Sequence, residues 1–283
     1  MVMVSRSYLV CATPRSGSTL LCELLKETGV AGRPEEYFEA KIKTGLPPHP
    51  GDYLADLPPT GAGVRSDPAP PRAPEYSSLI GLGSYRDHLE RTRRLGTTGN
   101  GVFGAKVMWG HLPDMQTFAR SLPEYESFEL YDLLERLFDS PRYVWVARRD
   151  KVRQAVSMWR ALQTRSWRLD HSGEAAERPE LRYSFSAIDH FVRTFRASDE
   201  EWARFFTAHG IDALEITYEE QLANDPEAAV RAVLDHIGVG APEGWQAELP
   251  LQRQADDLSE HWVATYLREA GAATKQPMLG SPR

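Results

Sequence analysis

The sequence predicts an α/β protein in which a mainly parallel central sheet is flanked by helices. Short apolar runs of strand length recur along the chain, and segments with helical spacing of apolar residues separate them. Short apolar runs of this kind are typical of parallel strands that are buried on both faces. The predicted strands are 8–12, 102–108, 142–147 and 213–217. The predicted helices are 18–28, 84–94, 125–138, 151–165, 187–208, 227–237 and 259–270.

Each helix is predicted from its own pattern. Glycines end two of them, because Gly29 follows 18–28 and Gly238 follows 227–237. The helix 125–138 repeats large apolar side chains on one face. The longest helix carries an apolar stripe that is more typical of a protein core than of a cofactor site: Ile188, Phe191, Val192, Phe195, Trp202, Phe205 and Phe206.

Two segments do not fit a sheet or its helices. Residues 44–83 begin with a stretch rich in Pro and Gly, and nine of the chain's 20 prolines lie between 44 and 74. A buried sheet does not accommodate so many prolines, so we expect a long surface loop or lid at 44–83. Residues 166–184 are predicted as a charged connector. With these loops, residues 1–283 are predicted to form a single domain.

The composition excludes several classes of function. A net charge of −7 argues against nonspecific binding of nucleic acid. No apolar run approaches the roughly 20 residues of a membrane-spanning helix, and no leader pattern precedes the first strand. The eight histidines show no metal-ligand spacing, so we expect no catalytic metal. Cys11 and Cys22 are expected to be buried free thiols in a cytoplasmic protein.

The loop that follows the first strand carries the chemistry of an anion site. Thr13-Pro-Arg-Ser-Gly-Ser-Thr19 places hydroxyls, one guanidinium and backbone N–H groups at the start of a helix. A nucleotide-triphosphate loop would need an opening Gly and a Lys after its last Gly, but Ser18 follows Gly17. The loop suits a phosphosulfate; the simpler alternative is a strand-to-helix turn with Ser18 as the N-cap.

A second basic cluster follows the strand 142–147. Arg148 stands at the strand end, and Ser157 lies on the next helix, so the two side chains are placed to bind one phosphate. The alternative is a surface ion pair of Arg148 or Arg149 with Asp150.

Together the two clusters resemble the superfamily of sulfotransferases that use 3′-phosphoadenosine-5′-phosphosulfate (PAPS). In that superfamily, a loop like Pro14-Arg-Ser-Gly-Ser-Thr19 binds the 5′-phosphosulfate, and a strand-end Arg with a helix Ser binds the 3′-phosphate. The closer resemblance is to the trehalose 2-O-sulfotransferase family of mycobacteria and related actinobacteria. The stretches that carry this resemblance are Tyr8-Leu-Val, Arg15–Leu21, Thr28–Gly32, Pro34-Glu-Glu-Tyr-Phe38, Gly104–Trp109, Gln154–Ser157, Trp159-Arg-Ala161 and Arg253-Gln-Ala-Asp256.

The resemblance implies a sulfotransferase fold of P-loop type and a role for each matching residue. Glu36 would be the general base, with its neighbours Glu35 and Glu39 as competitors; a solvated acidic face is the simpler alternative. The chemistry agrees, because a sugar hydroxyl must lose its proton as it attacks sulfur. Arg15 would stabilise the leaving phosphate, for which no metal is required. The implied donor-binding residues are Arg15, Ser16, Gly17, Ser18, Thr19, Arg148, Ser157, Tyr218, Arg253 and Gln254, and the implied acceptor-side residues are Glu36, Lys106 and Trp159.

The sequence also departs from the family, and these departures leave the acceptor open. Residues 44–74 show little similarity, Arg149 replaces a Pro, and Gly110-His111 replaces an amide residue. Loops of this kind usually shape the acceptor pocket. We expect trehalose, but the hydroxyl of a lipid or secondary metabolite is the alternative. A P-loop kinase or a non-catalytic nucleotide-binding module is a more distant alternative. The resemblance further implies a homodimer.

Overall fold

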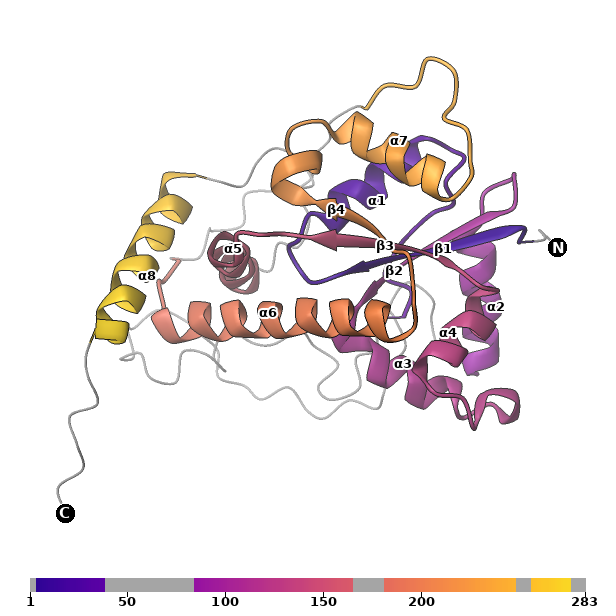
Figure 1. The fold of residues 1–283 in the computed structure, drawn as a ribbon, viewed down its shortest axis with the longest axis horizontal. Coiled ribbons are helices and arrows are strands. Elements are labelled where there is room, and N and C mark those ends of the chain that lie inside the picture. Colours follow the sequence, from indigo (N-terminus) through magenta and orange to yellow (C-terminus); the bar gives the residue numbers. More distant parts are fainter. Residues whose placement is uncertain (1–3, 39–83, 165–180, 248–255, 276–283) are drawn as a thin grey trace. The chain divides into compact units, whose positions relative to one another are not determined.

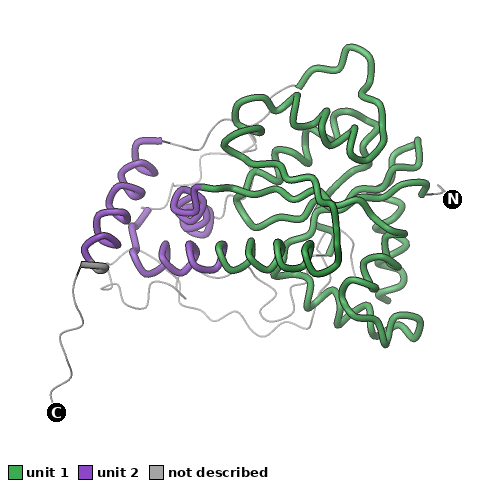
Figure 2. Tube along the Cα trace, viewed as in Figure 1, with its two compact units in different colours: residues 1–47, 67–149, 196–250 green, residues 48–66, 150–195, 251–283 purple. Residues whose placement is uncertain are grey.

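The computed structural model describes residues 4–38, 84–164, 181–247 and 256–275. The chain divides into two compact units (Figure 2). The first comprises residues 1–47, 67–149 and 196–250, and the second comprises residues 48–66, 150–195 and 251–283. The prediction that residues 1–283 form a single domain stays a prediction.

The first unit is built on a sheet of four parallel strands. These are β1 (Arg6–Ala12), β2 (Val102–Met108), β3 (Arg142–Ala147) and β4 (Leu214–Thr217), in the order β2-β1-β3-β4. In this register, Ala12 at the end of β1 pairs with Met108 of β2 and with Val146 of β3. The carboxyl ends of these strands therefore meet at one edge of the sheet. The predicted parallel sheet and its strands are confirmed.

Helices cover both faces of this sheet, as the prediction of a flanked sheet requires (Figure 1). Alternate residues of β1 point to opposite sides: Tyr8, Val10 and Ala12 join one buried cluster, and Leu9 and Cys11 join the other. The first cluster includes buried side chains of α1 (Ser18–Glu27) and α7 (Pro226–His236). The second is completed by α2 (Tyr85–Gly96), α3 (Leu112–Ala119), α4 (Leu130–Phe138) and the part of α6 (Phe185–Ala208) from Arg196 on.

The prediction of a helix at 125–138 is wrong in its N-terminal part. The α-helix begins at Leu130, and a 3₁₀ turn, η3 (Pro123–Tyr125), precedes it. Here Pro123 favours a tight turn with its fixed φ. The sequence prediction also missed α3 and the 3₁₀ turn before it, η2 (Trp109–His111). Both Cys11 and Cys22 are buried free thiols, as predicted, and burial raises the pKa of Cys22 to about 12.

The second unit has a helical core of its own. It contains α5 (Lys151–Thr164), the beginning of α6, and α8 (Asp257–Lys275). Buried aromatic and aliphatic side chains of these helices form one cluster, which includes Trp159, Phe191 and Trp262. The Arg153 guanidinium links α5 to α8 through Glu260, with Nη2 2.6 Å from Oε2. The predicted loop at 44–83 and most of the predicted connector at 166–184 lie outside the described residues.

Candidate active site at the carboxyl end of the sheet

The loop from β1 to α1 has an unusual backbone at two positions. Arg15 and Gly17 have φ angles of 63° and 96°, in the left-handed region. A residue other than Gly in that region is uncommon, and such residues concentrate at functional sites. The start of the loop is fixed from α6, because Trp202 Nε1 donates to Ala12 O at 3.2 Å and Thr13 Oγ1 donates to Asp199 at 3.3 Å.

This backbone leaves hydrogen-bond donors at the N-terminus of α1. The first hydrogen bond of the helix runs from Leu21 N–H to Gly17 O at 3.2 Å, so the three N–H groups before it have no acceptor within the helix. The Ser16 hydroxyl is fully buried and has no hydrogen-bond partner among the residues that the structure describes. Donors at the positive end of a helix dipole favour an anion. A phosphosulfate group fits these residues.

Gly17 is required where it stands. It is the N-cap of α1, so the alternative that assigned this place to Ser18 is wrong. A Cβ on Gly17 would lie 2.5 Å from Cδ2 of Tyr218, closer than side chains tolerate. Tyr218 begins the short π-helical turn η4 (Tyr218–Leu222), which follows β4 directly. The loop and the end of β4 are therefore in contact through this glycine.

Arg148 joins the same group of residues. Its guanidinium lies over the Tyr218 ring, 4.7 Å from the ring centre, and its Nη1 donates to Arg15 O at 3.3 Å. Burial and the neighbouring charge of Arg148 lower the pKa of Arg15 to about 10, so Arg15 keeps its charge at neutral pH. Two adjacent cations repel each other, and a nearby anion offsets this repulsion. The donor-binding roles predicted for Arg15 and Arg148 stay predictions.

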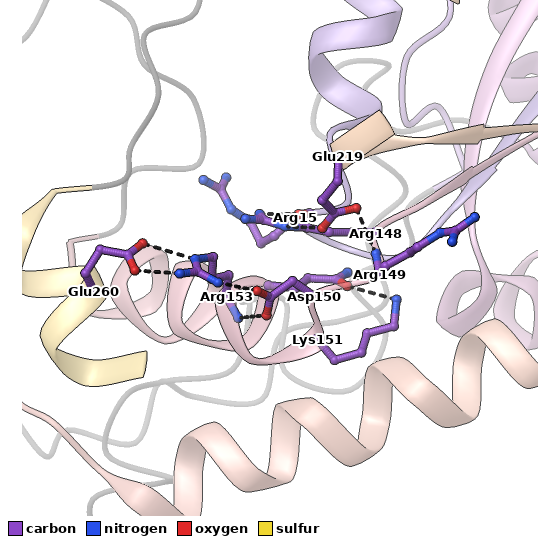
Figure 3. A network of polar contacts seen from close by, with 9 residues as sticks. Arg15, Arg148, Arg149, Asp150, Lys151, Arg153, Glu219 and Glu260 are labelled. Atoms are coloured by element: carbon purple, nitrogen blue, oxygen red, sulfur yellow. Dashed lines mark hydrogen bonds and ion pairs between the residues drawn. The ribbon is translucent and has the colours of Figure 1, made fainter. Parts of the chain in front are cut away.

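Glu219 balances part of this charge, and the sequence analysis did not identify it. Its Oε1 lies 3.7 Å from Arg148 Nε, and its Oε2 accepts from the Arg149 N–H at 2.9 Å (Figure 3). The next residue, Glu220, pairs with Arg149 at 3.0 Å. Acidic residues directly after a strand, at the same sheet edge as an Arg, were the signal in the sequence. Asp150, the partner considered for these arginines, pairs with Arg153 within the second unit.

An ion pair between a buried lysine and a partly exposed glutamate lies on the β2 side of the loop. The Lys106 side chain is 3% exposed, and its Nζ lies 2.7 Å from Glu36 Oε1. The same Nζ donates to Thr19 Oγ1 at 3.1 Å. Burial lowers the pKa of Lys106, but the Glu36 carboxylate raises it by more. The net pKa is therefore raised, and Lys106 is an ammonium. One side chain thus contacts both the carboxylate predicted as base and the loop.

The structure also distinguishes Glu36 from its neighbours. Glu35 forms an ion pair with Lys26 of α1, and its backbone oxygen accepts from the Lys106 N–H at 2.9 Å. The Glu35 carboxylate is thus paired with Lys26, and its charge also contributes to the raised pKa of Lys106. Glu39, the other competitor, lies outside the described residues.

The Stf0 sulphotransferase family matches residues 7–269 of the chain. The chain belongs to the Stf0 sulphotransferase family.

Two curated relatives match the chain over nearly its full length. A trehalose 2-sulfotransferase of Mycobacterium tuberculosis is 37% identical over 278 residues, 98% of each chain. A trehalose 2-sulfotransferase of Mycolicibacterium smegmatis is 36% identical over 266 residues, 93% of this chain and 95% of that one. A crystal structure of a sulfotransferase from Alicyclobacillus acidocaldarius covers 98% of both chains at 15% identity, but its TM-score of 0.42 is too low to add to the assignment. As a member of the Stf0 sulphotransferase family, the protein is an enzyme that transfers a sulfuryl group.

The remaining predicted residues of this sulfotransferase belong to the second unit or lie outside the described ranges. Ser157 and Trp159 are on α5 in the second unit. Trp159 is fully buried there, and its Nε1 donates to Arg182 O at 2.6 Å, so packing accounts for its surroundings. Its contact with the acceptor stays a prediction. Arg253 and Gln254 lie outside the described residues.

Neither a metal site nor a membrane segment emerges from the described part of the chain. Within residues 4–38, 84–164, 181–247 and 256–275, no three His, Cys, Asp or Glu side chains are grouped to hold a metal ion. Over the same residues, no helix has both the length and the apolar character needed to cross a bilayer.

Proposed function

We propose that this protein transfers the sulfuryl group of PAPS to the 2-hydroxyl of trehalose. The donor is supported by the loop 13–19, whose N–H groups, buried Ser16 hydroxyl and Arg15 suit a phosphosulfate. The acceptor is supported by the two relatives named as trehalose 2-sulfotransferases, which match this chain over nearly its full length.

The observation that carries the mechanism is the position of Glu36. Lys106 Nζ lies 2.7 Å from Glu36 Oε1 and 3.1 Å from Thr19 Oγ1, so this carboxylate is one side chain away from the donor loop. An ion pair with Lys106 requires the carboxylate form, which can accept a proton. Glu36 takes the proton of the acceptor hydroxyl while the hydroxyl oxygen forms a bond to sulfur. The bond from sulfur to the bridging oxygen breaks, and its electron pair stays on the phosphate.

Three groups of residues are proposed to stabilise the leaving phosphate and to bind the rest of the donor and the acceptor. The N–H groups of α1 and the Arg15 guanidinium stabilise the charge that develops on the phosphate. We assign the 3′-phosphate to Arg148, which Tyr218 orients by stacking, together with Ser157. Arg253 and Gln254 are proposed to complete the donor site, and Trp159 to face the acceptor. The proposed homodimer adds no residue to this scheme.

The first test combines PAPS with trehalose and identifies the products by mass spectrometry. We expect sulfated trehalose together with 3′-phosphoadenosine-5′-phosphate (PAP). The Glu36→Gln variant should reduce kcat by about 100-fold or more, because it removes the proton acceptor. Glu35→Gln is the matched control, since it changes the adjacent carboxylate, and it should retain most of the activity.

Each other outcome contradicts one part of the proposal. Sulfation of a long-chain alcohol in place of trehalose would contradict the acceptor. Greater loss in Glu35→Gln than in Glu36→Gln would contradict the base. An absence of PAP with every acceptor would contradict PAPS as the donor.

A further inference from the structure

Lys106 needs an explanation because of where its charge lies. It is in β2, all of whose residues are buried, and its side chain is 3% exposed. Removing an ammonium from water is costly unless it is paired and hydrogen-bonded. A strand whose residues are all buried gains nothing from such a residue by packing alone. The charge is therefore best explained by what it contacts.

The contacts of Lys106 join two parts of the site. An ammonium has three N–H donors and no acceptor. One donor is directed at Glu36 Oε1, 2.7 Å away, and another at Thr19 Oγ1, 3.1 Å away. We propose that Lys106 is a positioning residue that couples the base Glu36 to the donor loop through Thr19. This inference rests on the proposed function, since it assumes Glu36 as the base.

The contact with Thr19 determines the direction of that hydroxyl. Thr19 is the second residue of α1, beside the N–H groups that face the donor. Its oxygen accepts a hydrogen bond from Lys106, so its own hydrogen is directed elsewhere and can be donated to an anion in the loop. A hydroxyl that accepts from a cation is also a stronger donor, because hydrogen bonds in a chain polarise one another.

The contact with Glu36 links this hydroxyl to the chemistry. Before transfer, the Lys106 charge is balanced by the Glu36 carboxylate. Once Glu36 has accepted the acceptor's proton, it is neutral and the negative charge has moved to the leaving phosphate. Lys106 has then lost the charge of its ion-pair partner, and its other hydrogen bond leads, through Thr19, to the loop that holds this phosphate. One ammonium thereby supports the base at the start and the leaving group at the end.

The test is a pair of double-mutant cycles, one for turnover and one for donor binding. Lys106→Met removes the charge and keeps a similar shape; we expect kcat to fall by about 100-fold in the wild type. In the Glu36→Gln background the same change should cost less than about 3-fold, because residues that act through one another are not additive. Lys106→Arg, which keeps the charge, should recover part of kcat. Arg231→Gln, which breaks an exposed ion pair on α7, is the control and should leave kcat unchanged.

The second cycle uses calorimetric titration with PAP and needs no acceptor. Lys106→Met and Thr19→Val should each weaken PAP binding by about 10-fold, the size of one lost hydrogen bond to a charged group. The double variant should also bind PAP only about 10-fold more weakly than the wild type, since both changes remove the same contact. Circular dichroism checks folding, and Lys106→Gln replaces Lys106→Met if the latter does not fold.

The outcomes separate this inference from the proposed function. The coupling would be overturned if the loss of kcat in Lys106→Met/Glu36→Gln equalled the product of the two single losses. The same holds for the loss of PAP affinity in Lys106→Met/Thr19→Val. Unchanged kcat and PAP affinity in Lys106→Met would overturn any role of Lys106. A wild-type protein that sulfates no acceptor would contradict the proposed function, and the PAP cycle would still test the link from Lys106 to Thr19.

Discussion

Gly17 shows how much of the donor loop depends on a single residue. Its φ of 96° and the Tyr218 ring, which would lie 2.5 Å from an added Cβ, both exclude other side chains. We expect Gly17→Ala to weaken PAP binding by at least about 10-fold, as a displaced loop loses at least one hydrogen bond to the charged phosphate. The strained backbone itself should cost about 1 to 2 kcal/mol of stability.

Gly29 offers a control with the same kind of backbone and no clash. Its φ is 68°, and nothing lies within 4 Å of an added Cβ. Gly29→Ala should therefore lower the melting temperature while leaving PAP affinity unchanged. Equal PAP affinity in both variants, measured by calorimetry, would contradict the role given to Gly17.

At this scale, the sequence predicted residues whose roles are local. The loop residues 13–19 are consecutive, so their order alone predicted an anion site. Glu219 was not predicted, because its contact with Arg148 spans 71 positions of the chain and depends on the pairing of β3 with β4. The burial of Trp159 was missed for the same reason: its neighbours Phe191 and Trp262 lie far along the sequence.

At the scale of elements, the start of α8 is held by one side chain. The Asp256 carboxylate accepts from the Ser259 N–H at 2.9 Å, as an N-cap residue does, and from Arg160 Nη1 and Nη2 at 2.7 Å. Burial raises the pKa of Asp256, but Arg160 and the Ser259 N–H lower it more, so the net pKa is lowered. We expect Asp256→Ala to cost about 1 kcal/mol at pH 7, mostly from the lost cap, because the ion pair is largely exposed.

The lowered pKa gives this effect a definite pH dependence. A carboxyl with a lowered pKa in the folded protein adds stability above its unfolded value of about 4 and loses it as the pH falls through the folded pKa. The difference in melting temperature between the wild type and Asp256→Ala should therefore shrink from pH 7 to pH 3. The exposed neighbour Asp257, changed to Ala, is the control. A constant difference across this range would contradict the pairing.

The strands were predictable at this scale, and one helix was not. Runs such as 142–147 are short and apolar, and their burial follows from composition. The segment 109–119 contains Gly110 and Pro113, which favour a turn, yet it forms η2 and α3. Pro113 is tolerated because it lies in the first turn of α3, where its missing N–H would have no partner. Leu112 and Met115 then bury that helix against the sheet.

At the scale of the whole molecule, the charge of the site opposes that of the chain. The net charge is −7, yet Arg15 and Arg148 lie together at the carboxyl end of the sheet, and Glu219 balances only part of their charge. Such a separation concentrates an anionic donor at the site without attracting nucleic acid over the whole surface. The parallel topology makes this possible, because it brings segments from four distant parts of the sequence to that edge.

The proposed mechanism requires that the loop 13–19 holds the donor while Glu36 faces the acceptor. A crystal structure of the protein with PAP and trehalose tests it most directly. The 5′-phosphate is predicted to lie within hydrogen-bond distance of the N–H groups of Gly17, Ser18 or Thr19, with a trehalose hydroxyl on the Glu36 carboxylate. A 5′-phosphate bound elsewhere, or trehalose bound out of reach of Glu36, would contradict the account.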